Sequence, residues 1–233
     1  MLVSSNKEIL LTKQKEVRFL KSHYKVLENQ KIYCSLVLDY TGSMNLLYQR
    51  GIIQNLIEEV LPAILEFDDN GALEVWLFED SYHRLPDVTI NNYTRYVERE
   101  ILGKYTMGET TNYSPVIESV LNTYKKRVTK TFFHKAEPKY PEYVVFVTDG
   151  DNSDKGLTDK SIIKASKYPI FWQFIGVGRE QFTYLEKLDN MSGRFVNNAD
   201  FFKIDDLSTV TWDKIFNEFP DWLDTSEVQE MLA

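Results

Sequence analysis

Two patterns of hydrophobic residues alternate along the chain. Short runs that are apolar at nearly every position are typical of strands buried on both faces of a parallel sheet, whereas apolar residues at every third or fourth position are typical of amphipathic helices. We expect strands at 32–38, 72–78, 84–89, 143–147, 170–175 and 194–196. We expect helices at 7–30, 52–65, 91–102, 114–126, 158–167 and 182–188. This alternation predicts an α/β fold, doubly wound, with a mostly parallel central sheet flanked by helices.

No Pro-, Gly- or Ser-rich linker divides the chain, so one main domain with terminal extensions is the simplest organisation. We predict an N-terminal helical arm at 1–30, the main domain at 31–222 and a C-terminal helical tail at 223–233. The arm carries several lysines, which we expect to form a solvated helix face rather than a binding site.

The composition narrows the classes of function. Of the 233 residues, 43% are hydrophobic, which is enough for a sizeable core. The formal net charge of −8 argues against nucleic-acid binding, which needs clustered Lys and Arg, and favours a cation or a protein as the ligand. The single cysteine, Cys34, excludes a disulfide within the chain. We find no convincing secretory signal and no apolar stretch long enough to span a bilayer, so we expect a cytoplasmic protein.

Oxygen-bearing side chains follow two of the expected strands. Asp39, Thr41 and Ser43 come directly after the first strand, and Asp149 follows the strand at 143–147. The carboxyl ends of parallel strands share one edge of the sheet, where ligands of such folds bind. Between them in the chain lies a polar loop at 108–115, in which Thr111 offers a further hydroxyl. Carboxylate and hydroxyl oxygens suit a hard divalent cation such as Mg²⁺ or Ca²⁺.

Three motifs in this order, DYTGSM at 39–44, TTNYSPVI at 110–117 and VVFVTDGDNSD at 144–154, resemble the von Willebrand factor A (vWA) domain and its metal-ion-dependent adhesion site. The resemblance implies one divalent cation, Mg²⁺ first and Ca²⁺ or Mn²⁺ as alternatives. Its implied ligands are Asp39, Thr41, Ser43, Thr111 and Asp149. The segments at 75–78, 149–154 and 170–174 are similar to intracellular vWA domains of bacterial tellurite-resistance and stress proteins, which implies a role near metal or stress response without a defined reaction.

The chain departs from the vWA pattern at two points. Thr41 stands where the family usually has Ser, but the donor oxygen is kept. Glu109 and Thr110 precede Thr111 where the family often has two glycines, and their side chains restrict positive φ angles. Glu109 could also cover the cation or supply a ligand itself. We expect Asp151 and Asp154 to start the following helix rather than to bind metal.

These features favour a divalent-cation-dependent protein-interaction module over an enzyme. Two carboxylates and three hydroxyls do not fill six positions, so one position stays open for a carboxylate of a protein partner. An Mg²⁺-dependent phosphohydrolase is an alternative, but it would need an acid two residues after Asp39, where this chain has Thr41. A scaffold whose metal site serves only stability is a second alternative.

Overall fold

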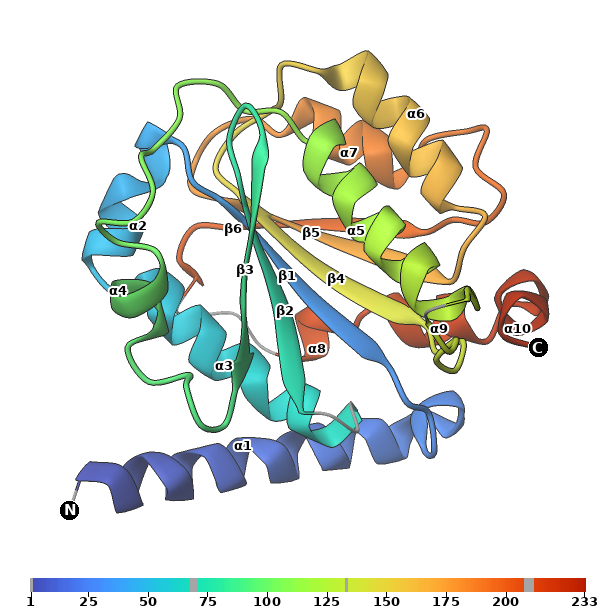
Figure 1. Ribbon diagram of the computed structural model, residues 1–233, viewed down its shortest axis with the longest axis horizontal. Coiled ribbons are helices and arrows are strands. Elements are labelled where there is room, and N and C mark those ends of the chain that lie inside the picture. Colours follow the sequence, from blue (N-terminus) through green and yellow to red (C-terminus); the bar gives the residue numbers. More distant parts are fainter. Residues whose placement is uncertain (1, 68–70, 133, 208–211) are drawn as a thin grey trace.

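Six strands form one sheet in the order β3-β2-β1-β4-β5-β6 (Figure 1). The structure is a computed structural model that describes residues 2–67, 71–132, 134–207 and 212–233. The strands are β1 Tyr33–Asp39, β2 Ala72–Phe78, β3 Tyr82–Thr89, β4 Glu142–Thr148, β5 Ile170–Val177 and β6 Ala199–Ile204. β3 pairs with β2 in the antiparallel sense and every other pair is parallel, so the predicted fold class is confirmed.

Helices cover both faces of this sheet (Figure 1). They are α1 Leu2–His23, α2 Asn45–Gln49, α3 Ile52–Phe67, α4 Tyr96–Glu100, α5 Ser114–Val128, α6 Lys155–Ala165, α7 Thr183–Asp189, α8 Trp212–Ile215, α9 Phe219–Leu223 and α10 Ser226–Leu232, with short 3₁₀ turns η1 Lys25–Leu27 and η2 Gly42–Met44. Helices α5, α6 and α7 pack on one face, and α1, α3, α4, α9 and α10 contribute to the core on the other face. No described helix is both long enough and apolar enough to cross a membrane.

The two cores explain why the strand runs are apolar at every position. In β1, Leu36 and Leu38 belong to the core that includes α3, whereas Val37 belongs to the core that includes α5. Successive side chains of a strand point to opposite faces, so a strand covered on both sides has no polar face.

Three predicted elements differ from the structure. The helix predicted at 7–30 is too long at its carboxyl end, because α1 ends at His23 and only the 3₁₀ turn η1 follows. The strand predicted at 194–196 is wrong, because β6 lies at Ala199–Ile204. β6 is an edge strand that carries Asp200 and Lys203, so its apolar pattern is weak. The helix predicted at 91–102 is too long, because only α4 is helical there. The Asn92 side-chain oxygen accepts a 2.7 Å hydrogen bond from the Thr89 amide, which stabilises a turn in place of the first part of the helix.

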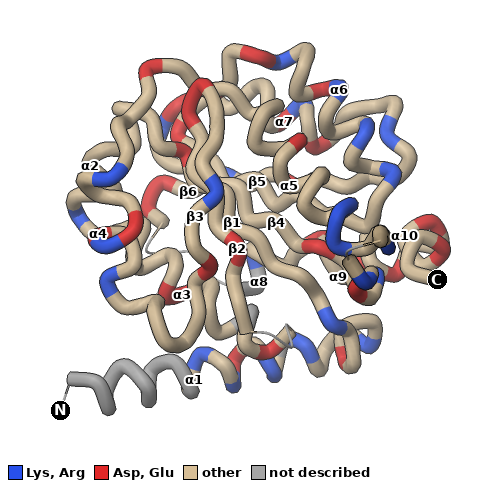
Figure 2. Tube along the Cα trace, viewed as in Figure 1, with Lys and Arg blue, Asp and Glu red and all other residues tan. Residues whose placement is uncertain are grey.

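The N-terminal helix is bound to the domain through its basic face. Arg18 donates to Glu66 of α3 at 2.7 Å, Lys13 forms an ion pair with Glu59, and Val17 is buried in the core. In the described part of α1, basic residues outnumber acidic ones, with Glu16 alone among Lys13, Lys15, Arg18 and Lys21 (Figure 2). Part of the basic face predicted to be solvated is therefore paired with α3, while the division into arm, domain and tail stays a prediction.

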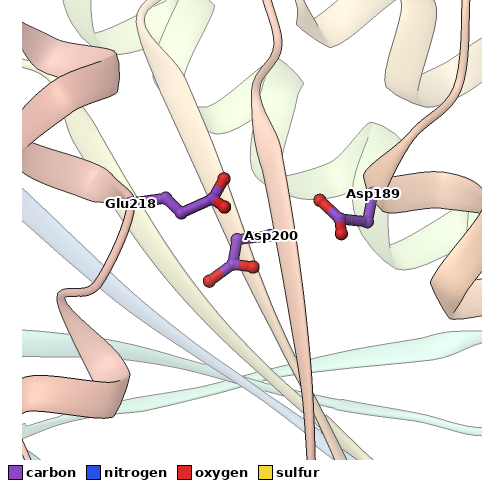
Figure 3. A group of neighbouring side chains, drawn as sticks. All are labelled: Asp189, Asp200 and Glu218. Carbon is purple, nitrogen blue, oxygen red and sulfur yellow. The ribbon is translucent and has the colours of Figure 1, made fainter.

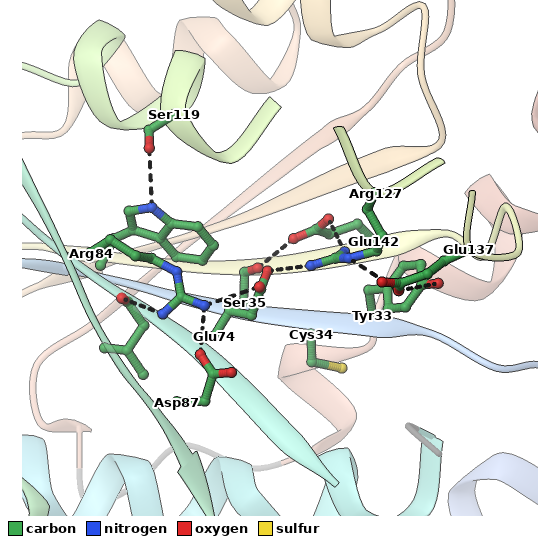
Figure 4. A network of polar contacts seen from close by, with 12 residues as sticks. Tyr33, Cys34, Ser35, Glu74, Arg84, Asp87, Ser119, Arg127, Glu137 and Glu142 are labelled. Carbon is green, nitrogen blue, oxygen red and sulfur yellow. Dashed lines mark hydrogen bonds and ion pairs between the residues drawn. The ribbon is translucent and has the colours of Figure 1, made fainter. Parts of the chain in front are cut away.

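A buried ionic network lies at the amino ends of the central strands (Figure 4). Glu142 is fully buried, accepts a hydrogen bond from the Ser35 hydroxyl, and lies 3.2 Å from Nη1 of Arg127. Arg127 also donates to Glu74 at 2.6 Å, and Glu74 pairs with Arg84 at 3.0 Å. Burial raises the pKa of Glu142 to about 7, although the charge of Arg127 lowers it.

We expect Glu142→Gln to change how stability depends on pH. The pKa of Glu142 in the folded chain is about 7 against an ordinary 4.5, so the folded state binds more protons between these values. The contribution of Glu142 to the free energy of unfolding therefore falls as pH rises from 4.5 to about 7. Because Gln cannot ionise, the variant should gain about 1–3 kcal/mol relative to wild type across this window.

Urea unfolding of both proteins at several pH values measures this difference. Glu230→Gln, at an exposed position of α10, is the control and should follow the wild-type pH profile. A difference between Glu142→Gln and wild type that stays constant with pH would contradict the expectation.

Candidate metal centre

The ends of β1 and β4 meet at one edge of the sheet. Leu38 pairs with Val147, so the next residues, Asp39 and Thr148, lie side by side. Both are fully buried, and the Thr148 hydroxyl donates to Oδ2 of Asp39 at 2.6 Å. Thr148 thus orients the Asp39 carboxylate, a role that the sequence motif did not reveal.

The turn after Asp39 brings two hydroxyls beside its carboxylate. The Thr41 amide and hydroxyl both donate to Oδ1 of Asp39, at 2.9 and 2.6 Å. The 3₁₀ turn η2 then places Ser43 beside Thr41, and the Ser43 Oγ lies 3.2 Å from Oγ1 of Thr41. The Tyr48 hydroxyl donates to the Asp39 carbonyl at 2.8 Å and anchors the start of this turn.

Ser43 connects the first strand end to the second. Its hydroxyl donates to Oδ1 of Asp149 at 2.8 Å. Asp39, Thr41, Ser43 and Asp149 therefore form a continuous series of oxygen atoms, which we call the rim series. Ser43 is exposed and Asp149 is half-buried, so the series runs from the protein interior to solvent.

Thr111 is held beside the rim series through its backbone. Its carbonyl accepts a 2.8 Å hydrogen bond from the Ser153 amide, and the next residue, Asn112, donates its amide to the Glu79 carbonyl at 2.7 Å. The loop is thus fixed between the end of β2 and the segment after β4. Among the described hydrogen bonds, none joins the Thr111 hydroxyl to the rim series.

The loop needs glycine at a different position from the one expected. Neither Glu109 nor Thr110 has a positive φ angle, and both are exposed, so side chains are tolerated there. Gly108 instead exchanges backbone hydrogen bonds of 3.1 Å with Tyr40 and Gly42. A Cβ atom on Gly108 would lie 2.4 Å from Cβ of Glu79, which is closer than non-bonded carbon atoms approach.

Asp151 and Asp154 bind the starts of neighbouring helices. Asp154 occupies the N-cap position of α6, but its carboxylate accepts from the amides of Tyr113 and Ser114, at 3.0 and 2.8 Å, where α5 begins. Asp151 accepts from the Tyr184 amide at 3.3 Å, in the first turn of α7. Carboxylates at helix amino ends are stabilising, so Asp154 links the loop of Thr111 to the segment of Asp149.

Burial disfavours ionisation of both rim carboxyls. It raises the pKa of Asp39 to about 6, although the hydrogen bonds from Thr148 and Thr41 lower it and the charge of Asp149 raises it. Burial also raises the pKa of Asp149, against the hydrogen bond from Ser43. Among the described ion pairs, none involves Asp39 or Asp149, so the protein itself offers these carboxylates no basic partner there.

The rim series fits a small hard cation. Neighbouring oxygens are 2.6, 3.2 and 2.8 Å apart in the order Asp39, Thr41, Ser43 and Asp149. These are hydrogen-bond distances, so the four side chains already lie close together. The donor set of carboxylates and hydroxyls suits a hard divalent cation such as Mg²⁺ or Ca²⁺.

The fold and the oxygen-rich rim define the class as a vWA domain. Structural neighbours include the vWA domain of SpRpn10, with a TM-score of 0.54 and 8% identity over 86% of this chain and 97% of that one. The TFIIH p34 N-terminal domain aligns with a TM-score of 0.56 and 13% identity over 81% of this chain and 98% of that one. The ArnB paralog VWA2 from Sulfolobus acidocaldarius has a TM-score of 0.51 and 17% identity over 82% of this chain, which spans only 44% of that protein.

Residues 31–232 match the family described as vWA-TerF-like, the "vWA found in TerF C terminus", and the chain belongs to this family. The uncharacterized protein YcbR of Bacillus subtilis is 39% identical over 196 residues, which are 81% of this chain and 76% of YcbR. Nicotinic receptor-associated protein 1 of Caenorhabditis elegans is 30% identical over 136 residues, 58% of this chain but only 20% of that protein. vWA domains are a family of protein-interaction modules.

We expect Gly108→Ala to destabilise the chain. The added Cβ must push the loop away from Glu79, and overpacking of this kind costs about 1–3 kcal/mol. Gly42→Ala is the matched control, because nothing lies within 4 Å of a Cβ at that position, and it should change stability by no more than about 0.5 kcal/mol. Urea unfolding compares the two variants, and equal stability would show that the Gly108 contact is unimportant.

Proposed function

We propose that this chain is a divalent-cation-dependent protein-interaction module, with Mg²⁺ held at the rim by Asp39, Thr41, Ser43, Thr111 and Asp149. The observation that carries the proposal is the rim series, because it brings together four oxygen-bearing side chains from two strand ends, and carboxylates and hydroxyls are the ligands that a hard cation such as Mg²⁺ takes. Asp39 and Asp149 would supply the negative charge, and the hydroxyls would orient the cation.

Thr111 enters the proposal through the resemblance and through the position of its loop. The loop is bonded to Ser153 and, through Tyr113, to Asp154, and both of these partners follow Asp149 closely in the chain. These contacts support a fifth ligand from the third motif. The exposed side chain of Glu109 is compatible with a site that stays open to solvent.

The open coordination position would receive the partner. Ser43 is exposed and Asp149 is half-buried, so solvent reaches this side of the rim series, whereas Asp39 lies on the interior side. A carboxylate from an Asp or Glu of another protein is the ligand that a hard cation prefers there. Binding would then depend on the metal, because each protein supplies only part of the coordination shell.

We also propose that the partner belongs to a tellurite-resistance or stress-response system of the bacterial cytoplasm. The family description, which refers to the C terminus of TerF, supports this assignment. The name of the nematode relatives, which refers to association with a receptor, supports protein binding as the general role. Capture of bacterial proteins on the purified chain, with Mg²⁺ or with chelator, would identify cation-dependent partners.

We expect Ser43→Ala to weaken Mg²⁺ binding by roughly tenfold, and Asp149→Asn to weaken it at least as much, since loss of even an outer ligand contact has effects of this size. Isothermal titration calorimetry measures the affinity. Ser43 is exposed, so its replacement should leave the fold intact. Ser153→Ala is the matched control, because Ser153 is an exposed serine of the same rim that binds Thr111 through its backbone amide.

Three outcomes would decide against the proposal. If the Ser43→Ala and Asp149→Asn proteins fold and bind Mg²⁺ with wild-type affinity, the rim is not the metal site. If the chain still captures its partner in the presence of chelator, and if the Ser43→Ala protein captures it too, the metal serves only to stabilise the fold. Hydrolysis of a phosphate ester with Mg²⁺, abolished by Asp39→Asn, would identify a phosphohydrolase instead.

A further inference from the structure

A second acidic cluster lies at the start of the edge strand β6 (Figure 3). Asp189 ends α7, Asp200 is the second residue of β6, and Glu218 directly precedes α9. One carboxylate oxygen from each lies within 4.8 Å of the other two. Asp200 is buried, while Asp189 and Glu218 are partly accessible. The rim series is at the opposite, carboxyl end of the parallel strands, so the two groups are independent.

The negative charge of this cluster is poorly compensated. Burial raises the pKa of Glu218, and the charges of Asp200 and Asp189 raise it further, against the effect of Arg194. Two nitrogens of the Arg194 guanidinium are bonded to the backbone, with Nε donating to the Met191 carbonyl at 2.9 Å and Nη2 to the Asp189 carbonyl at 2.7 Å, while its buried Nη1 has no partner among the described residues. Three carboxylates and one guanidinium leave two negative charges, which a divalent cation would balance.

Two buried amide side chains beside Asp200 have polar atoms without a hydrogen-bond partner among the described residues. Gln173 of β5 pairs directly with Asp200, so both side chains lie on the same face of the sheet. Asn198 comes two residues before Asp200, and its carbonyl accepts from the Trp172 amide at 2.9 Å, which continues the strand alternation. Both side chains are fully buried, and Nε2 of Gln173 and both side-chain polar atoms of Asn198 lack hydrogen bonds. Buried polar atoms in native proteins nearly always have a hydrogen-bond partner, so these unpartnered atoms point to a ligand beside them.

The contacts of Tyr143 favour a reversed Gln173 amide. The Tyr143 hydroxyl reaches both Oε1 of Gln173, at 3.4 Å, and the Ile215 carbonyl. One hydroxyl proton cannot serve two acceptors, and amide oxygen and nitrogen are interchangeable assignments. With the amide reversed, Gln173 donates to Tyr143 and Tyr143 donates to Ile215. The unpartnered atom is then an oxygen on the face that carries Asp200.

We propose that the carboxylates of Asp189, Asp200 and Glu218, with the amide oxygens of Asn198 and Gln173, bind one Ca²⁺ ion. Oxygens bound to Ca²⁺ at 2.3–2.6 Å are at most about 5 Å apart, and one carboxylate oxygen from each of the three acidic residues lies within 4.8 Å of the others. A mixture of carboxylate and amide oxygens in irregular geometry is typical of Ca²⁺ rather than Mg²⁺. The ion would tie the end of α7 and the start of α9 to the edge strand.

The test uses the full chain with Ser43→Ala and Asp149→Asn combined, here called the rim double variant, so that the rim binds the added ion much more weakly. Calorimetric titration with Ca²⁺ should still detect one site. Adding Glu218→Gln should weaken that site at least roughly tenfold, since one charged ligand is lost. Glu230→Gln, also an acidic residue of the C-terminal helices but exposed on α10, should leave it unchanged. Mg²⁺ should bind this site more weakly than Ca²⁺.

Thermal unfolding separates a metal ligand from a structural residue. The parent protein is the rim double variant. In chelator, adding Glu218→Gln should leave the melting temperature of the parent unchanged or raise it, because the substitution removes repulsion between the carboxylates of the cluster. In excess Ca²⁺ the parent should become the more stable protein by mass action. The proposal would be overturned if the rim double variant did not bind Ca²⁺. It would also be overturned if adding Glu218→Gln to that variant left its Ca²⁺ affinity unchanged. A lower melting temperature of Glu218→Gln in both conditions, with no gain of the parent in Ca²⁺, would also overturn it.

Discussion

The parallel pairing of β1 with β4 is the constraint on which the candidate metal centre depends. Tyr33 lies opposite Glu142 and Leu38 opposite Val147, so the two strands end at the same level. Asp39 can then accept from Thr148 while the same carboxylate accepts from Thr41. A shift of one residue would turn each side chain to the other face. It would separate the turn after Asp39 from the segment that carries Asp149.

Buried carboxylates have different partners at the two ends of these strands. At the amino ends, Glu142 has Arg127 within 3.2 Å, and Arg127 in turn contacts Glu74. At the rim, the described partners of Asp39 and Asp149 are hydroxyls and amides, which orient carboxylates without neutralising them. A buried charge requires compensation. Arg127 provides it at the amino ends, whereas none of the described ion pairs provides it at the rim.

Local sequence patterns predicted most of the fold. Runs such as that of β4 are apolar throughout because two helical layers cover the sheet, and this environment leaves a clear signal. The edge strand β6 was misplaced because Asp200 and Lys203 interrupt its apolar pattern. The motifs also identified the four side chains of the rim series, whose role as metal ligands stays a prediction. They did not reveal Thr148 or Gly108, whose importance depends on contacts with Asp39 and Glu79.

The sequence by itself determined the α/β class and the order of the oxygen-bearing motifs, because both follow from residues close together in the chain. Only the tertiary structure decided that Asp154 binds the start of α5 and that Gly108 packs against Glu79. It also gathered Asp189, Asp200 and Glu218 at the start of β6. Such contacts join distant segments, and their residue types have no periodic pattern. The physical reason is that strand order and helix packing, rather than local preference, bring these side chains together.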